Sequence, residues 1–333
     1  MHYKKELGDG KMDRDNLIKA YHSMVLIREY ENFVEETTAA GTGPLMGLMH
    51  SHSGAEAWVS AVMMNLTYDD YVSSTYRNHA HSIARGIDLN TFTAEISGKK
   101  TGVCNGMAGN MHAVDQDLNM IAGFGIIGAG LPSANGAALA IKMKKQDLVS
   151  AVFFGDGAMA QGAFHESCNI ASIKKLPVLL CNDNNHYAMS THYSNNLCHE
   201  STTEYMKAYG IPAVTVDGMD FFASYEAVKV AIEYIRAGKG PYFIEFDNCR
   251  YGGQWVGDPV NYKTKEQKEA EYARCGIKHF EQAVLKENLL TQKDMDDVRQ
   301  AVKKEIDDAI KFAEESELPE LDAMYENIYA DTY

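Results

Sequence analysis

The feature that most narrows the fold of this chain is an ordered alternation of elements between residues 149 and 187. Residues 149–154 form a short apolar run rich in Val and Phe, followed at once by Gly-Asp-Gly-Ala. Residues 178–181 form a second apolar run, followed by Asn-Asp-Asn-Asn-His-Tyr, and residues 162–174 between the two runs have a helical pattern. Two buried strands joined by a helix are typical of a parallel sheet. The pattern therefore predicts an α/β fold.

Polar groups follow both of these predicted strands, at the sheet edge where α/β folds bind their ligands. Asp156 follows the first strand and Asn185 follows the second. One carboxylate, one amide oxygen and the main-chain carbonyl of Tyr187 leave room for diphosphate oxygens and water, which suits octahedral Mg²⁺. The backbone amides of Gly157 and Ala158, at the head of a helix, are placed to bind phosphate. Gly-Asp-Gly alone, or Asn-Asn alone, is more often an ordinary turn. The predicted Mg²⁺ and diphosphate site therefore depends on the two motifs occurring together, each after a strand.

Several segments together resemble one protein family. The paired motifs are similar to those of the thiamine-diphosphate fold. Residues 161–177 more narrowly resemble the alpha subunit of the decarboxylating first component of 2-oxo acid and acetoin dehydrogenase complexes. Further similar segments follow in order: His-Ser-His-Ser-Gly-Ala-Glu-Ala at 50–57, Tyr-Arg-Asn-His-Ala-His at 76–81, and residues 106–112, 123–129 and 258–263. The resemblance covers residues 20 to 270, roughly three quarters of the chain.

The resemblance implies a fold and a division of the chain. The expected fold is a thiamine-diphosphate-binding α/β fold, a mainly parallel sheet flanked by helices, with helical N- and C-terminal extensions. We expect an N-terminal helical segment over residues 1–45, a diphosphate-binding domain over 46–262, and a C-terminal helical segment over 263–333 that belongs to the same globular unit. Periodicity predicts helices from Asp13 or Asp15 to before Gly41 and over 54–66, 133–144 and 222–236, strands over 213–216 and 242–246, and two closing helices.

The resemblance also assigns residues to the cofactor. Tyr76 and Arg77 match family residues that reach the diphosphate, where a guanidinium offers two parallel donors to phosphate oxygens. Gly125 and Ile127 match residues that contact the pyrimidine and support the bent cofactor. Two plainer interpretations stay open: a surface salt bridge for Arg77 and simple core packing for Ile127.

Three further residues are catalytic candidates by the same resemblance. His50 and His79 match residues at the substrate entrance, where an imidazole can orient a carbonyl or stabilise a developing oxyanion. Gln254 stands where the family has a His that contacts diphosphate and substrate. Solvent-facing imidazoles and a transition-metal site remain alternatives for the histidines, and an ordered loop residue without ligand contact remains one for Gln254.

The resemblance implies an enzyme that uses thiamine diphosphate and Mg²⁺ to cleave the C–C bond next to a carbonyl, in pyruvate, acetoin or another 2-oxo acid, and passes the acyl group to lipoyl. By the same resemblance we expect a beta subunit to supply the glutamate that activates the pyrimidine, an assembly of two alpha and two beta chains, and a lipoyl acyltransferase as a further partner. A biosynthetic acyl-transfer or carboligation subunit with another acceptor is the alternative, and a binding subunit without turnover is a third.

Composition agrees with a metabolic enzyme. The net charge of −15 argues against nucleic acid and anionic membrane surfaces as partners. The six Cys form no Cys-x-x-Cys pair, so reduced thiols and a cytoplasmic location are expected. Residues 121–141 carry no charge, but five Gly and one Pro would break a membrane helix. We predict a buried glycine-rich loop and a core helix there.

Overall fold

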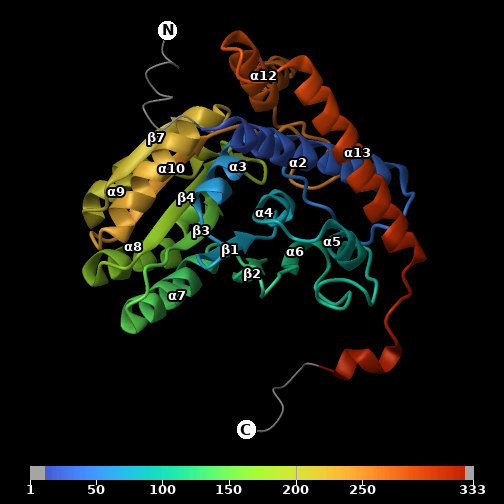
Figure 1. Ribbon diagram of the computed structural model, residues 1–333. Coiled ribbons are helices and arrows are strands. Elements are labelled where there is room, and N and C mark those ends of the chain that lie inside the picture. Colours follow the sequence, from blue (N-terminus) through green and yellow to red (C-terminus); the bar gives the residue numbers. More distant parts are fainter. Residues whose placement is uncertain (1–11, 200, 327–333) are drawn as a thin grey trace.

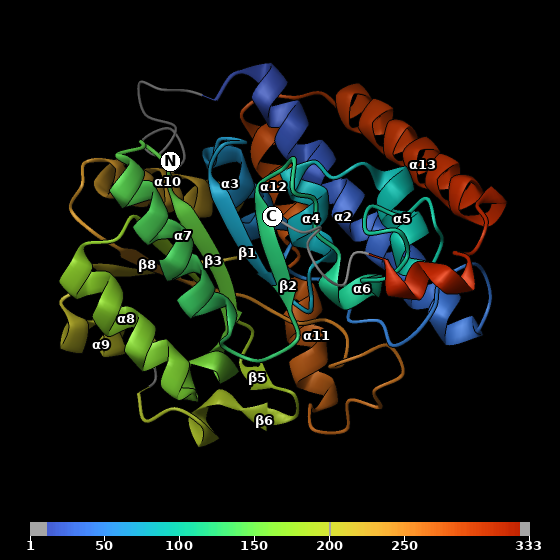
Figure 2. The same cartoon turned by 90° about the horizontal axis from the view of Figure 1, so that it is seen from below.

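The computed structural model describes residues 12–199 and 201–326. Its centre is a sheet of six parallel strands in the order β2-β1-β3-β4-β8-β7. The strands are β1 (Tyr71–Thr75), β2 (Met120–Phe124), β3 (Ser150–Gly155), β4 (Val178–Asn184), β7 (Ala213–Asp217) and β8 (Tyr242–Asp247). A small antiparallel hairpin, β5 (Tyr187–Ala188) with β6 (Thr191–His192), lies beyond the end of the sheet (Figure 2).

Helices cover both faces of the sheet. The α7 and α8 helices pack together on the face seen in Figure 2. On the opposite face α3 packs with α10, α2 packs on α3 and α4, and α13 packs on α2 and α5 (Figure 1). The helices are α2 (Arg14–Ala40), α3 (Glu56–Asn65), α4 (His79–Arg85), α5 (Leu89–Ile96), α6 (Gly109–His112), α7 (Gly130–Lys144), α8 (Gly162–Lys174), α9 (Thr203–Met206), α10 (Phe221–Arg236), α11 (Lys265–Ala273), α12 (Gly276–Lys286) and α13 (Gln292–Glu315).

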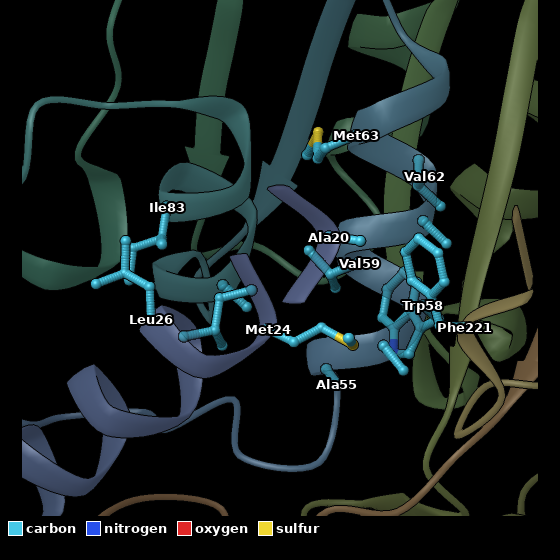
Figure 3. Close-up of a cluster of buried hydrophobic side chains, with 14 of the residues drawn as sticks. Ala20, Met24, Leu26, Ala55, Trp58, Val59, Val62, Met63, Ile83 and Phe221 are labelled. Atoms are coloured by element: carbon cyan, nitrogen blue, oxygen red, sulfur yellow. The ribbon is translucent and has the colours of Figure 1, made fainter. Parts of the chain in front are cut away.

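The sheet is buried on both faces, which explains why its central strands are apolar runs without alternation. Neighbouring side chains of β3 point to opposite faces: Phe153 joins the core beneath α2, α3 and α10, and Phe154 joins the core beneath α7 and α8. Trp58 of α3 lies in the first core with Met24 of α2 and Phe221 of α10 (Figure 3). The predicted α/β fold with a parallel sheet and flanking helices is confirmed.

Helix caps match the expected signals at both ends of the chain. The side chain of Asp13 accepts a hydrogen bond from Asn16 N at 2.8 Å, and Gly41 ends α2 in the left-handed region at φ +64°. Thr291 and Asp294 form a capping box at the start of α13. These local signals fix the bounds of α2 and the start of α13, and packing against α3, α4 and α13 fixes where α2 lies.

Two expectations need correction. After residue 263 the described residues form three α-helices rather than two, because the chain leaves the helical path at Arg274 and Cys275, between α11 and α12. The uncharged stretch 121–141 begins with the edge strand β2, and the loop after it is not buried, since Ile126 is 76% exposed. Within the described residues, no helix combines the length and apolar character needed to cross a membrane. The domain boundaries at residues 45 and 262 stay a prediction.

Candidate functional site

A cavity of about 520 Å³ opens at the carboxyl ends of β1, β3 and β4. This is the edge at which parallel sheets bind ligands. Eleven of the twelve predicted site residues line it: His50, Tyr76, Arg77, Gly125, Ile127, Asp156, Gly157, Ala158, Asn185, Tyr187 and Gln254. The side chain of His79, the twelfth, lies outside the cavity. The fold thus brings together segments that are up to 204 residues apart, from His50 to Gln254.

Asp156 follows β3 directly and is 1% exposed. Its Oδ2 atom is buried and has no hydrogen-bond partner among the described residues. Burial, together with the nearby negative charge of Asp183, raises the pKa of Asp156 to about 7. A buried carboxylate oxygen without a partner is a costly arrangement unless a cation or a proton binds there.

The Asn185 side chain is held in one orientation. Its Nδ2 donates to Oδ2 of Asp183 at 3.3 Å, and its Oδ1 accepts from the backbone N–H of Tyr187 at 3.2 Å. Asp183 is a second carboxylate lining the cavity, which the sequence analysis did not assign. It accepts from Nδ2 of Asn248 at 2.8 Å and lies 3.4 Å from Nε2 of His52. Burial opposes its ionisation, but these contacts hold the pKa of Asp183 below its usual value.

The turn after β3 approaches the β5–β6 hairpin closely. A Cβ atom on Gly157 would lie 2.7 Å from Cβ of Ala188, so only glycine fits there. The carbonyl of Tyr187 accepts a hydrogen bond from Nη1 of Arg250 at 3.1 Å. A metal ion at this carbonyl would therefore share it with, or displace, the Arg250 guanidinium.

Two buried guanidinium groups face this end of the cavity without a carboxylate in salt-bridge contact in the described part of the chain. Arg77 is 5% exposed and donates to the carbonyls of Ser51 and Gln254, and Arg250 is 3% exposed and donates to the carbonyls of Tyr187 and Met189. Burial lowers the pKa of Arg77 from its usual value. The surface salt bridge considered for Arg77 is thereby excluded. Arg250 carries no assignment from the sequence, although it lies four residues before Gln254 in the same loop.

Gln254 connects these groups. Its Oε1 accepts from Nη2 of Arg77 at 3.3 Å and from Nη1 of Arg250 at 3.1 Å, and its Nε2 donates to the hydroxyl of Tyr76 at 2.8 Å. Its carbonyl also accepts from Nδ1 of His50 at 2.8 Å. A neutral amide at this position spaces the two cations without neutralising them.

The two predicted histidines have different environments. Nδ1 of His50 donates to a carbonyl, so its Nε2 is the proton acceptor of the neutral ring. Burial, and more weakly Arg77, lowers the pKa of His50. His79 is fully buried, with its Nδ1 3.1 Å from Oε2 of Glu31 and its ring packed against Tyr30. His50 can therefore act as a base at the cavity, whereas His79 contacts α2.

Apolar residues form part of the cavity mouth. Ile127 is 44% exposed and Met189 is 59% exposed, and both line the cavity next to Ile126. Exposure of Ile127 excludes simple core packing. A Cβ on Gly125 would lie 2.9 Å from Cε1 of His112, so the loop backbone runs close against its neighbour.

Two buried cationic side chains lie beside an unpaired carboxylate and helix-terminal amides. This geometry fits a diphosphate with a divalent cation. Comparison with known proteins agrees. A family model described as "Dehydrogenase E1 component" matches residues 22–322. The chain belongs to this family, and the predicted class, an oxidoreductase component of the pyruvate and acetoin dehydrogenase type, is confirmed. Membership implies thiamine diphosphate as the cofactor.

Individual relatives are similar over nearly their whole length. The alpha subunit of acetoin:2,6-dichlorophenolindophenol oxidoreductase from Bacillus subtilis is 39% identical over 310 residues, which cover 93% of this chain and 92% of the relative. The alpha subunit of the same oxidoreductase from Cupriavidus necator is 35% identical over 319 residues, 96% of this chain and 95% of the relative. The pyruvate dehydrogenase E1 component subunit alpha of Rickettsia bellii is 33% identical over 324 residues, which cover 97% of this chain and 99% of the relative.

Proposed function

We propose that this chain is the alpha subunit of a thiamine-diphosphate-dependent first component that cleaves the C–C bond next to the carbonyl of acetoin or pyruvate and passes the acyl group to lipoyl. The observation that carries the proposal is the pair of buried guanidinium groups, Arg77 and Arg250, held on neutral acceptors beside the unpaired carboxylate oxygen of Asp156. Buried charges are normally paired, so the set is complementary to a doubly charged anion with its cation.

Each proposed ligand has a defined place in that arrangement. Asp156, the Oδ1 of Asn185 and the carbonyl of Tyr187 would bind Mg²⁺, and the amides of Gly157 and Ala158 with Arg77 and Tyr76 would bind the diphosphate. When bound, thiamine diphosphate supplies the electron sink for cleavage next to a carbonyl. Gly125 and Ile127 would support its pyrimidine.

His50 supports acetoin as a substrate. Cleavage of a 2-hydroxy ketone releases the hydroxyl proton, and a neutral imidazole with its Nε2 as acceptor is suited to take it. Burial lowers the pKa of His50, which keeps the ring neutral at physiological pH. Decarboxylation of pyruvate needs no such base. The relatives named above include acetoin and pyruvate enzymes, which favours the oxidative function over the biosynthetic alternative.

A beta subunit is proposed to cover the cavity mouth and to supply the carboxylate that activates the pyrimidine. Exposed Ile126, Ile127 and Met189 around the mouth support this, because large apolar side chains gather where a partner binds. An assembly of two alpha and two beta chains, a lipoyl acyltransferase partner and a cytoplasmic location complete the proposal. The six free thiols are in keeping with that location.

Reconstitution tests the function. The chain is combined with its beta subunit, Mg²⁺ and thiamine diphosphate, and turnover of acetoin and pyruvate is followed with 2,6-dichlorophenolindophenol as electron acceptor. We expect turnover of at least one substrate, and we expect proton exchange at the thiazolium carbon, followed by NMR, to be fast only with both chains. Fast exchange with this chain alone would contradict the need for a partner glutamate, and no turnover of either substrate would contradict the proposed reaction.

A further inference from the structure

One buried side chain of α2 contacts two segments that carry cavity residues. Glu31 is fully buried, and its Oε1 accepts from the backbone N–H of His52 at 2.9 Å. Its Oε2 lies 3.1 Å from Nδ1 of His79. His52 lies two residues after His50, and His79 lies two residues after Arg77. A single carboxylate thus joins the segment of the candidate base to the turn of the candidate diphosphate ligand.

Two other side chains on the same face of α2 bind the first segment. Glu35 accepts from the hydroxyls of Ser51 and Ser53, and Arg28 donates through Nε to Oε1 of Glu56 at 2.7 Å. Positions 28, 31 and 35 are three and four residues apart, so they share one helix face. The segment from Ser51 to Glu56 is therefore attached to a rigid helix at three points, of which Glu31 alone also reaches α4.

The charge of Glu31 has few other compensating contacts. Burial opposes ionisation, but His79 and the backbone N–H of His52 hold the pKa of Glu31 below its usual value. Nε2 of His79 has no hydrogen-bond partner among the described residues, and its ring packs between Tyr30 and Phe92. The bond to Glu31 is thus the polar contact that fixes the His79 ring.

We propose that Glu31 is a positioning residue for the reaction, which fixes the segment bearing His50 relative to the turn bearing Arg77. His79 acts through Glu31 and does not contact the substrate. This inference rests on the proposed function, because the roles of His50 and Arg77 are assigned there. If an amide replaces the Glu31 carboxylate, its single oxygen can accept from only one of the two donors, His52 N–H or His79 Nδ1. The amide must then turn its own NH₂ toward the other donor.

The test compares Glu31→Gln with Glu36→Gln, a matched control on an exposed position of the same helix. In the complex with the beta subunit, we expect Glu31→Gln to lower kcat at least tenfold while KM changes less than threefold and the thermal midpoint stays above the assay temperature. Amide hydrogen exchange of residues 50–53, measured by mass spectrometry on this chain without substrate, should accelerate at least tenfold. Unchanged exchange and a kcat equal to that of Glu36→Gln would overturn the proposal.

If Glu31→Gln does not fold, a second pair of variants tests whether the contact between Glu31 and His79 is needed for turnover. The side-chain amide of His79→Asn can still donate to Glu31, whereas His79→Ala cannot. We expect kcat of His79→Asn to be at least five times that of His79→Ala. Equal kcat values for the two variants would show that the hydrogen bond to Glu31 does not support turnover. Failure of the proposed function would appear differently, as absence of turnover in the unmodified complex, and the exchange measurement would still test Glu31.

Discussion

Arg77 and Arg250 donate to the same oxygen atom, Oε1 of Gln254, from Nη2 at 3.3 Å and from Nη1 at 3.1 Å. Like charges held around one neutral acceptor repel each other, and neither guanidinium has a carboxylate in salt-bridge contact in the described part of the chain. The protein folds around these charges and leaves them available to an anion. A change of charge at residue 254 should therefore alter both the stability of the chain and its affinity for an anion.

Gln254→Glu is expected to pair with both guanidinium groups. The free energy of unfolding of the cofactor-free chain should rise, while cofactor affinity should fall at least tenfold, about 1.4 kcal/mol, because the new carboxylate competes with the diphosphate. Gln254→Ala should instead destabilise the cofactor-free chain by about 1.5 to 3 kcal/mol, since it removes hydrogen bonds to charged groups. Urea unfolding and calorimetric titration measure both effects, with exposed Gln300→Glu as the control. Unaltered cofactor affinity in Gln254→Glu would remove the two arginines from the diphosphate site.

Asp156 should make cofactor binding release protons. Burial and Asp183 raise its pKa to about 7 from 3.8, so between these values the folded, metal-free chain holds a proton that the unfolded chain has lost. Its contribution to the free energy of unfolding therefore falls as pH rises through this window, and the loss is complete above about pH 7. A cation must displace the proton, so Mg²⁺-dependent cofactor affinity should increase up to about pH 7 and then level off.

Calorimetric titration just below pH 7, in two buffers with different heats of ionisation, counts the released protons. The heats should differ between buffers for the unmodified protein and agree for Asp156→Asn, which has no proton to release. The same heat in both buffers for the unmodified protein would mean that no proton leaves Asp156 on binding.

Gly54 should tolerate no side chain. Its φ is +108°, and a Cβ there would lie 2.0 Å from the carbonyl oxygen of Cys249. Gly54→Ala should therefore cost about 3 kcal/mol or more of unfolding free energy, with a shift of the loop that leads to Gln254. Gly41→Ala is the matched control, because φ is also positive at +64° but nothing lies within 4 Å, and only the left-handed backbone costs about 1 to 2 kcal/mol. Equal midpoints in urea for the two variants would contradict the close approach.

Ile126 should contribute to association with the beta subunit. It is 76% exposed at the cavity mouth, so Ile126→Asp removes little internal packing and should leave the fold intact. Desolvating a new carboxylate in an interface should weaken association at least tenfold. Analytical ultracentrifugation of the two chains measures this, with Val230→Asp on α10, 53% exposed and outside the cavity lining, as the control. If both variants assemble like the unmodified chain, the partner binds elsewhere.

Sequence patterns predict some elements of this fold and not others. Strands β3, β4 and β8 are apolar runs because both of their faces are covered, so periodicity identifies them. The edge strand β2 and its neighbour β1 read Met-Ile-Ala-Gly-Phe and Tyr-Val-Ser-Ser-Thr, with glycine and hydroxyls that dilute the apolar signal. These two strands were not predicted, although they form one wall of the cavity.

Within the site, too, residues are predictable only where a local sequence pattern marks them. Asp156 and Asn185 are predictable because each directly follows an apolar strand. Asp183 lies two residues before Asn185 in the same Asn-Asp-Asn-Asn run, near the end of β4, and could have been assigned with them. Glu31 has no such sequence signal, since its partners His52 and His79 are 21 and 48 residues away and the contact exists only once α2 packs on α3 and α4. Tertiary contacts of this kind do not follow from local spacing.

The unpaired arginines also make the stability of the protein depend on its supply of cofactor. A ligand that binds only the folded chain adds RT ln(1 + [L]/Kd), about 2.7 kcal/mol at one hundred times Kd. In the proposed site, diphosphate relieves the repulsion between Arg77 and Arg250 that weakens the empty chain, so we expect a cell short of thiamine to lose this protein to unfolding and proteolysis as well as losing its turnover. The charges proposed to bind the cofactor would thereby tie the abundance of the enzyme to the vitamin it uses.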